Sequence, residues 1–387
     1  MAADPTCALG LIADDLTGAA DTAVQFARRG WEALLILENA RLKPSPTTAA
    51  VRLTAFAKAS AVKEPDSTCS QVFAVATDVR ALDHAAAEKL TADAVAKLVD
   101  AGIDRIYLKI DSTMRGSVPG QVAGALSIWR KKYPDALAVV CPAYPKMGRI
   151  VRANHLLVDG RPVEQSAIGR DPVTPVTTGD LGVLIPGSMC VKSPAKAGPY
   201  VQIVTVDAAT DEDLAAIASA IDAAGPRVIP VGSAGLAEAM AARWDHLGGV
   251  RPSKAPARRG AENSRILIQV TSLNPASHAQ VARLAHVFPD VVVLTGKAEQ
   301  ISATFAERVE RERWDVLGLI GGDGARAALG RLGATAIRIV DALHEGIPFG
   351  FVVSGRADGM PLFTKAGGFG GEDALVRAVE ILKGLKG

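Results

Sequence analysis

Short apolar runs alternate with longer alanine-rich stretches along most of the chain. The run Ala8–Ala13 contains no charged residue and predicts a buried strand, and residues 17–29 predict a helix with its apolar side chains on one face. Thr17 is the expected N-cap of this helix and Gly30 its expected end. Further strands are expected at 71–76, 105–110, 137–141, 201–206, 227–231, 265–270, 291–294, 316–320 and 336–340, and further helices at 84–101, 211–224, 275–287 and 372–383. This alternation predicts an α/β fold with mostly parallel sheets covered by helices on both faces.

Two stretches interrupt the alternation. Residues 142–200 are rich in proline and glycine and are expected to form loops near the functional site. Residues 248–262 are basic and nearly free of large apolar side chains, as is typical of a linker. A chain of 387 residues also exceeds what one hydrophobic core usually supports. We therefore expect two α/β domains, 1–247 and 263–387, with the active site in the cleft between them.

The composition argues against several classes of protein. The 43 basic and 41 acidic residues nearly balance, so the chain has no surplus charge for nucleic acid, and no apolar run is long enough to cross a membrane. The first residues lack the basic-then-apolar layout of a signal peptide, which favours a cytoplasmic protein. The four cysteines form no C-x-x-C pair and the six histidines no HExxH motif, so we expect free thiols and no histidine-ligated zinc.

Charged residues follow several predicted strands at their carboxyl ends. Asp14 and Asp15 come directly after the first strand, and Asp78 and Arg80 follow the strand at 71–76. Ligands of open α/β sheets bind outside the carboxyl ends of the strands, so Asp14 or Asp15 is a candidate for chemistry on a substrate hydroxyl. Capping of the helix by Asp15, with Asp14 in solvent, is an equally compatible interpretation. If the strands share a parallel sheet, all these charges meet at one rim.

The segment 109–116 places polar groups of both charges after another predicted strand. It contains Lys109, Asp111, Ser112 and Arg115. A lysine in a buried strand needs a partner or a cavity, because an unpaired buried ammonium is costly. Lys109 and Asp111 share a strand face, so a structural ion pair is one interpretation. We favour the other, which is that the cluster binds a polar, anionic ligand.

Glycine-rich turns occur in the C-terminal half, one of them directly after the strand predicted at 316–320. They lie at 321–324 (Gly-Gly-Asp-Gly) and at 366–371, after Lys365, and a similar turn lies at 232–235. Backbone N–H groups in such turns bind phosphate oxygens, helped by the dipole of a following helix. The chain has no Walker A motif and no G-x-G-x-x-G with an acidic residue about twenty positions on. The turns therefore predict a nucleotide or phosphate site without specifying the reaction.

Taken together, these segments resemble the four-carbon acid sugar kinases. The matching segments occur in the family's order over nearly the whole chain and are IADDLTGAAD (12–21), TDVR (77–80), KIDSTMRG (109–116), CPAYP (141–145), RDPVTP (170–175), GSAGL (232–236), GGD (321–323) and KAGGFG (365–370). The resemblance implies a sugar-acid-binding domain at 1–247, joined by the linker 248–262 to a nucleotide-binding domain at 263–387. It also implies an enzyme that uses ATP and Mg²⁺ to phosphorylate the terminal hydroxyl of threonate, erythronate or 3-oxo-tetronate.

The resemblance also implies roles for individual residues. The substrate would contact Asp14, Asp15, Arg80, Lys109, Asp111, Ser112, Arg115 and Asp171, and ATP would contact Ser272, Gly321, Gly322, Asp323, Gly324 and Gly368. One of Asp14 and Asp15 would accept the proton of the terminal hydroxyl, and Lys109 with Arg80 or Arg115 would hold the substrate carboxylate. No ligand residue is assigned to the metal.

Two positions depart from the pattern of the family. Thr271 stands where the family usually has the glycine of a Ser-Gly-Ser turn, and Gly324 stands where a threonine commonly follows Gly-Gly-Asp. Two other functions therefore stay open, a non-catalytic sensor of sugar acids that has lost ATP turnover and a nicotinamide-dependent oxidoreductase. In each case the expected partners are small molecules, with neither nucleic acid nor membrane, and the oligomeric state stays open.

Overall fold

The computed structural model describes residues 8–37, 70–191, 202–247 and 263–385. The predicted linker 248–262 lies outside the described residues. The strands are β1 (Ala8–Ala13), β2 (Glu32–Ile36), β3 (Gln71–Ala76), β4 (Arg105–Lys109), β5 (Leu137–Cys141), β6 (Arg149–Arg152), β7 (His155–Val158), β8 (Arg161–Pro162), β9 (Met189–Val191), β10 (Ile203–Val206), β11 (Val228–Gly232), β12 (Ile266–Val270), β13 (Val292–Thr295), β14 (Val316–Ile320), β15 (Ala336–His344), β16 (Ile347–Val353) and β17 (Pro361–Lys365). The α-helices are α1 (Leu16–Ala27), α3 (His84–Asp100), α4 (Val118–Lys132), α5 (Leu181–Leu184), α6 (Asp211–Ala224), α7 (Ala234–Arg243), α8 (Pro275–Val287), α9 (Ala298–Arg311), α10 (Gly322–Leu332) and α11 (Ala374–Leu382).

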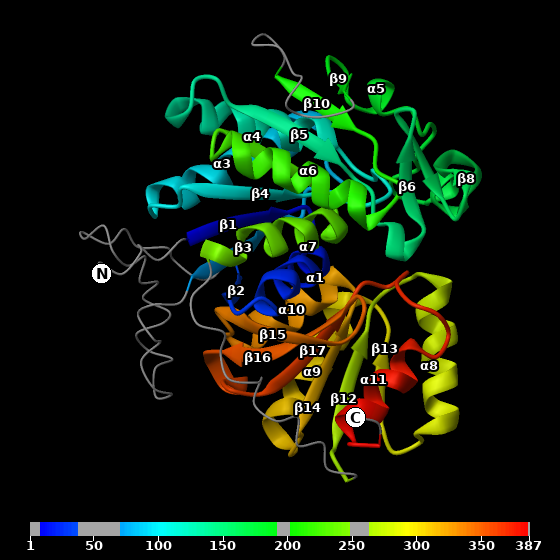
Figure 1. Ribbon diagram of the computed structural model, residues 1–387. Helices are drawn as coiled ribbons and strands as arrows, with labels where there is room; N and C mark the ends of the chain where they lie inside the picture. The colour runs from blue at the N-terminus through cyan, green and yellow to red at the C-terminus, as the bar shows by residue number, and fades with distance from the viewer. Residues whose placement is uncertain (1–7, 38–69, 192–201, 248–262, 386–387) are drawn as a thin grey trace.

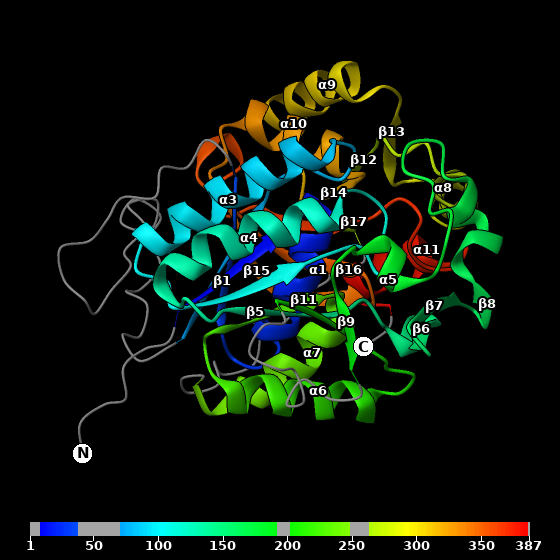
Figure 2. The same ribbon diagram turned by 90° about the horizontal axis from the view of Figure 1, so that it is seen from above.

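The predicted α/β fold with mostly parallel strands is confirmed, and one large sheet runs through both halves of the chain. Its fourteen strands lie in the order β13-β12-β14-β17-β16-β15-β2-β3-β1-β4-β11-β5-β10-β9. In Figure 2, α3 and α4 cover one face of the N-terminal strands, and α6 and α7 cover the other. We expected a sheet in each half; instead, antiparallel pairing of β2 with β15 joins the two sets of strands.

The nucleotide-half strands β12, β14 and β17 run opposite to β1, β3 and β4. The reason is that three successive pairs, β2–β15, β15–β16 and β16–β17, are antiparallel. Going from β1 to β14 crosses six pairs of neighbouring strands. Each pair is twisted by roughly 20–25°, so the strand direction rotates by a large angle over this distance. Figure 1 shows the result, with β12 and β14 crossing the direction of β1 and β4 steeply. Twist thus compensates for opposite strand directions and brings the carboxyl ends of both sets toward each other.

The hydrophobic core is continuous across the two halves. Leu11 on β1, Phe26 on α1, Leu317 on β14 and Ala325 on α10 belong to one buried cluster. Helix α1 packs against α7 and also contacts β15 and α10. It therefore lies at the boundary of the two halves, as Figure 1 shows.

Several local predictions differ from the structure. The helix predicted at 17–29 begins at Leu16 and ends at Ala27, before Gly30. Residues 142–200 were expected to be loops, but in the described part β6, β7 and β8 form a small antiparallel sheet. Cys141 and Cys190 are free thiols, as expected, and the other two cysteines lie outside the described residues. Among the described helices, none is long and apolar enough to span a membrane.

Candidate functional site

Charged side chains gather at the carboxyl ends of β3, β1 and β4, which are neighbours in the parallel part of the sheet. Asp14 follows β1, Arg80 lies in the loop after β3, and Asp111 lies in the loop after β4. Arg80 contacts both Asp14 and Asp111. The prediction that these strand ends share one rim is therefore confirmed.

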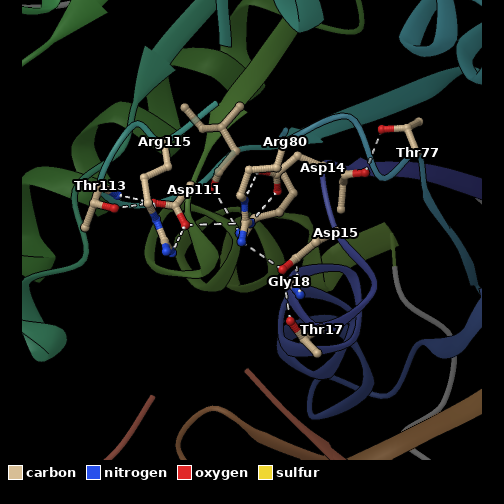
Figure 3. Close-up of polar contacts among 12 residues, drawn as sticks. Asp14, Asp15, Thr17, Gly18, Thr77, Arg80, Asp111, Thr113 and Arg115 are labelled. Carbon is tan, nitrogen blue, oxygen red and sulfur yellow. Dashed lines mark hydrogen bonds and ion pairs between the residues drawn. The ribbon is translucent and has the colours of Figure 1, made fainter. Parts of the chain in front are cut away.

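Arg80 is the centre of this polar site, as Figure 3 shows. Its Nε donates to Asp14 Oδ2 at 2.7 Å and its Nη2 donates to Asp14 Oδ1 at 2.9 Å, which makes a bidentate pair. Its Nη1 donates to Asp15 Oδ2 at 2.9 Å, and its Nη2 lies 3.6 Å from Asp111 Oδ2. Burial lowers the pKa of Arg80, but the three carboxylates outweigh burial and raise that pKa well above its usual value. The guanidinium is thus fixed by charge-assisted hydrogen bonds.

The two adjacent aspartates are held differently. Asp15 is the N-cap of α1, since its Oδ1 accepts from Gly18 N at 2.6 Å and its Oδ2 accepts from Thr17 Oγ1 at 3.0 Å. Thr17 as N-cap is therefore wrong, and capping by Asp15 is confirmed, whereas Asp14 is buried and not in solvent. Burial raises the pKa of Asp15, but Arg80, Lys109 and the Gly18 N–H outweigh it and hold that pKa below its usual range. Asp14 is 0% exposed, and burial raises its pKa against the attraction of Arg80.

A second arginine extends the network toward residues 142–200. Arg115 Nη2 donates to Asp111 Oδ2 at 2.7 Å, and its Nη1 donates to Asp171 Oδ2 at 3.2 Å. The hydroxyl that donates to Asp111 is that of Thr113, which the sequence did not single out, whereas Ser112 forms no hydrogen bond within the described part of this network. Burial raises the pKa of Asp111, but Arg115 and Arg80 hold it well below its usual range. Arg115 thus brings Asp171 into the same network as Asp111.

Lys109 is the last residue of β4 and is 6% exposed. Its Nζ donates to Ile110 O at 2.9 Å, and it forms no ion pair with a carboxylate of the described residues; in particular, the alternative Lys109–Asp111 pair is absent there, because Asp111 pairs with the two arginines. Gly18 makes room for the ammonium, since a Cβ on Gly18 would lie 3.1 Å from Nζ. An ammonium has three N–H donors, so Lys109 keeps donors for an anionic group.

The glycine turns of the C-terminal half also meet at one place, because β12, β14 and β17 are neighbouring parallel strands. Gly321 precedes α10 with φ 103°, and no side chain caps the N–H groups at the start of this helix. The N-terminal N–H groups of a helix have no partner within the helix and attract phosphate. A Cβ on Gly322 would meet nothing within 4 Å. The turn thus has the donors and the space that a nucleotide phosphate requires.

Two other loops close around this turn. A Cβ on Gly367 would lie 2.7 Å from Ser272 Cβ, and a Cβ on Gly368 would lie 2.8 Å from Asn274 Nδ2. The predicted ATP contacts Ser272 and Gly368 therefore lie in loops packed on each other. Lys365 is 0% exposed, and its Nζ donates to the carbonyl oxygens of Ala366 at 2.8 Å and Gly367 at 3.1 Å. Through these two hydrogen bonds Lys365 braces the glycine loop that follows it.

An ion pair connects the two halves. Arg326, on α10, pairs through Nε with Asp78 in the loop after β3, and its Nη2 donates to Ala76 O at 3.2 Å. Burial raises the pKa of Asp78 to about 6, although Arg326 lowers it. Asp78 also has φ 52°, which is uncommon outside glycine. The loop that carries Arg80 is thereby tied to the helix that follows the 321–324 turn.

Each half of the chain matches a known domain family. Residues 9–240 match a family model described as a sugar-binding N-terminal domain, and residues 254–375 match a nucleotide-binding C-terminal domain. A D-threonate kinase from Bordetella bronchiseptica is 33% identical over 97% of this chain and 97% of that protein. The chain belongs to the four-carbon acid sugar kinase family.

Other members of the family carry related names. A D-erythronate kinase from Heliobacterium modesticaldum is 31% identical over 60% of this chain and 52% of that protein. A solved Bordetella bronchiseptica structure, described as a domain of unknown function with bound citrate and as a domain-swapped dimer, is 31% identical, covers 98% of both chains and has a TM-score of 0.50. A Haemophilus influenzae structure with a TM-score of 0.67 and 18% identity, covering 96% of this chain and 100% of that chain, shares the fold.

Two residues that contact the other half of the chain were not identified from the sequence. Arg326 follows the glycine turn, but nothing in the sequence indicates that it reaches Asp78. Glu345, between β15 and β16, accepts a hydrogen bond from the Tyr144 hydroxyl, again across the two halves. Among the described residues, no three His, Cys, Asp or Glu side chains are grouped so that they could hold a metal ion.

Proposed function

We propose that this chain transfers the γ-phosphoryl group of ATP to the terminal hydroxyl of a four-carbon sugar acid. Membership of the family makes the chain a sugar acid kinase. Relatives named D-threonate kinase, from Bordetella bronchiseptica and Salmonella typhimurium, match 95–97% of the chain, so D-threonate is the first substrate to test. The polar rim at β3, β1 and β4 would bind the acid, and the turn at 321–324 would bind ATP.

The ion pair between Arg326 and Asp78 is the observation that carries this proposal. It connects the helix after the uncapped glycine turn with the loop that holds Arg80. A kinase needs the nucleotide and the acceptor hydroxyl to be held in one fixed geometry, because positioning and charge stabilisation supply most of its rate. Domains at 1–247 and 263–387, with the reaction between them, fit this arrangement.

The cations of the rim divide into two kinds. Arg80 and Arg115 are occupied by aspartates, whereas Lys109 is bound only by a carbonyl oxygen among the described residues. We therefore assign the substrate carboxylate to Lys109. The two arginines would instead fix the four carboxylates of the rim, which are those of Asp14, Asp15, Asp111 and Asp171. The more open of these carboxylates would then accept hydrogen bonds from substrate hydroxyls through their remaining lone pairs.

The proposal is tested by measuring ADP release with D- and L-threonate, D- and L-erythronate and the 3-oxo-tetronates. Phosphorus NMR of the product should show a phosphate ester on the terminal carbon of one of them. Absence of ADP release with every acid would refute the proposal. Calorimetric binding of a tetronate without binding of ATP would indicate the sensor instead, and reduction of a nicotinamide would indicate the oxidoreductase.

A further inference from the structure

Asp21 lies on α1, six residues after Asp15, and Glu345 of the C-terminal half acts electrostatically on it. Its carboxylate has no hydrogen bond or ion pair with any residue in the described ranges. Five charged or titratable groups act on it from the elements packed around it, namely Lys109 at the end of β4, Glu345 between β15 and β16, Tyr144 after β5, and Asp15 and Arg28 at the two ends of α1. It is a partly buried carboxylate that the described fold does not use.

The other two aspartates of the motif are poorly suited to accept a proton. Asp14 is 0% exposed, and both of its oxygens accept hydrogen bonds from Arg80. Asp15 accepts from Gly18 N, Thr17 Oγ1 and Arg80, and these contacts hold it ionised. A base needs an accessible oxygen and a pKa near the working pH. Neither residue meets both conditions.

Asp21 meets both conditions, an accessible oxygen and a pKa near the working pH. Burial raises the pKa of Asp21 to about 7, Lys109 opposes this rise, and Glu345 and Asp15 add to it. Glu345 is fixed by the Tyr144 hydroxyl, which donates to it. Glu345 therefore places its negative charge near Asp21 from the C-terminal half, in a position that the hydrogen bond from Tyr144 fixes.

The turn that carries Glu345 also touches the glycine loop at 366–371. Gly346 has φ 70°, and a Cβ there would lie 3.0 Å from Phe369 Cγ. The turn thus contacts that loop through Gly346 and acts on Asp21 through the Glu345 carboxylate. It links Asp21 with a glycine loop of the C-terminal half, where the nucleotide is proposed to bind.

Lys109 and Asp21 lie at the same face of α1. The Lys109 ammonium lies over Gly18, and Asp21 is three residues further along the helix, so both side chains belong to one helix face. An acid whose carboxylate binds Lys109 and whose carbon chain extends along this face toward the C-terminal half would present its terminal hydroxyl to Asp21.

We propose that Asp21, rather than Asp14 or Asp15, is the catalytic base, and that Glu345 is a positioning residue that acts on it from the other half. This inference rests on the proposed kinase function. The hydroxyl oxygen forms a bond to the γ-phosphorus of ATP, and the bond from that phosphorus to the β–γ bridging oxygen breaks, its electron pair leaving with ADP. The hydroxyl proton passes to an Asp21 oxygen.

The first test is Asp21→Asn. The matched control is Asp93→Asn, because Asp93 is an exposed residue of α3 that pairs with Lys89. A positioned base contributes about 10²–10⁴-fold, so kcat should fall by that factor in Asp21→Asn while calorimetric affinities for ATP and the acid stay within about threefold. Asp93→Asn should behave as the wild type. An Asp21→Asn enzyme that keeps kcat within about tenfold, or that no longer binds the acid, would overturn the inference.

The second test is the pH profile of Glu345→Gln, which keeps Asp21 intact. The wild-type kcat/KM should rise with pH through about 7, and removing the neighbouring charge should move this limb to lower pH by roughly half a unit or more. An unmoved limb would count against the role of Glu345 and Asp21. A wild type without ADP release for any four-carbon acid refutes the kinase function itself, whereas an active wild type with an equally active Asp21→Asn refutes this inference alone.

Discussion

Thr271 and Gly324 lie directly against each other, and a Cβ on Gly324 would lie 2.7 Å from the Cβ of Thr271. Gly324 can therefore carry no side chain while Thr271 is present. The resemblance to the family associates a glycine with the first position and a threonine with the second. The two departures of this chain thus compensate each other in space, and the phosphate-binding turn keeps its packing.

Restoring a threonine at position 324 alone should damage the turn. Overpacking a tight contact costs about 1–3 kcal/mol, so Gly324→Thr should lower the free energy of unfolding by that amount and raise the KM for ATP. The double variant Thr271→Gly/Gly324→Thr should recover most of both losses, because the two positions exchange side chains. Urea unfolding and ADP-release kinetics on the two single variants and the double variant measure the coupling. Strictly additive effects would contradict the compensation.

Lys109 should determine the affinity for the acid and leave the affinity for ATP unchanged. Lys109→Met removes the ammonium and keeps an unbranched side chain of similar length. A charge-assisted hydrogen bond is worth about 1.5–3 kcal/mol, so the KM for the sugar acid should rise about 10–150-fold, with the KM for ATP within twofold. Lys89→Met on α3 is the control, since Lys89 is exposed and pairs with Asp93 on the same helix. Equal effects on both substrates would argue for a structural role.

The pair Arg326–Asp78 should make stability depend on pH. The pKa of Asp78 is about 6 and above its usual value, so the folded state binds this proton more tightly than the unfolded state. Its contribution to stability therefore decreases as pH rises from about 4 to 6. Arg326→Met removes the attraction that lowers this pKa, so the decrease should be steeper and extend above pH 6. Urea unfolding at pH 5 and pH 8 should show an added loss of about 1–3 kcal/mol at pH 8, which Asp78→Asn in the same variant should reduce. A loss that is the same at both pH values would contradict this prediction.

Lys365 should have the opposite pH signature. Burial lowers its pKa to about 8, so the unfolded state binds this proton more tightly between pH 8 and the usual lysine value. Stability should therefore increase as pH rises from 7 to 9.5, by roughly 1–3 kcal/mol. Lys365→Met should abolish this increase, and thermal unfolding at several pH values compares the two proteins. An increase that persists in Lys365→Met would assign it to another group.

The apolar runs were enough to predict most of the parallel strands, because a strand buried on both faces must be apolar along its whole length. The rim formed by Asp14, Arg80 and Asp111 followed from them, since parallel neighbours place their carboxyl ends together. The strands β2, β16 and β17 and the helices α4 and α9 are among the elements that were missed. Glu32–Ile36 is only five residues long, and Gly120 and Gly124 weaken the helical pattern of α4.

Side-chain pairing was harder to predict from the sequence than the arrangement of the strands. Whether Thr17 or Asp15 caps α1 depends on one backbone conformation, which Asp15 adopts at φ −149°. The choice of Thr113 over Ser112 as the partner of Asp111 likewise depends on the direction of two adjacent side chains. Arg326 and Glu345 act on residues about 250 and 200 positions away, and only the twist of the sheet brings them there.

The pairing of β2 with β15 has a mechanical consequence. Four residue pairs, from Ala336↔Ile36 to Ile339↔Ala33, join the two halves through the backbone. Because of this pairing, the two halves cannot rotate freely against each other as two domains on a flexible linker can. Any closure over bound substrates must therefore occur by elastic twisting of the shared sheet. Separation of the halves would also leave each with a bare edge strand, and bare edges pair with other chains. Each half expressed alone is therefore expected to associate through that edge, and the intact chain to unfold in one cooperative transition.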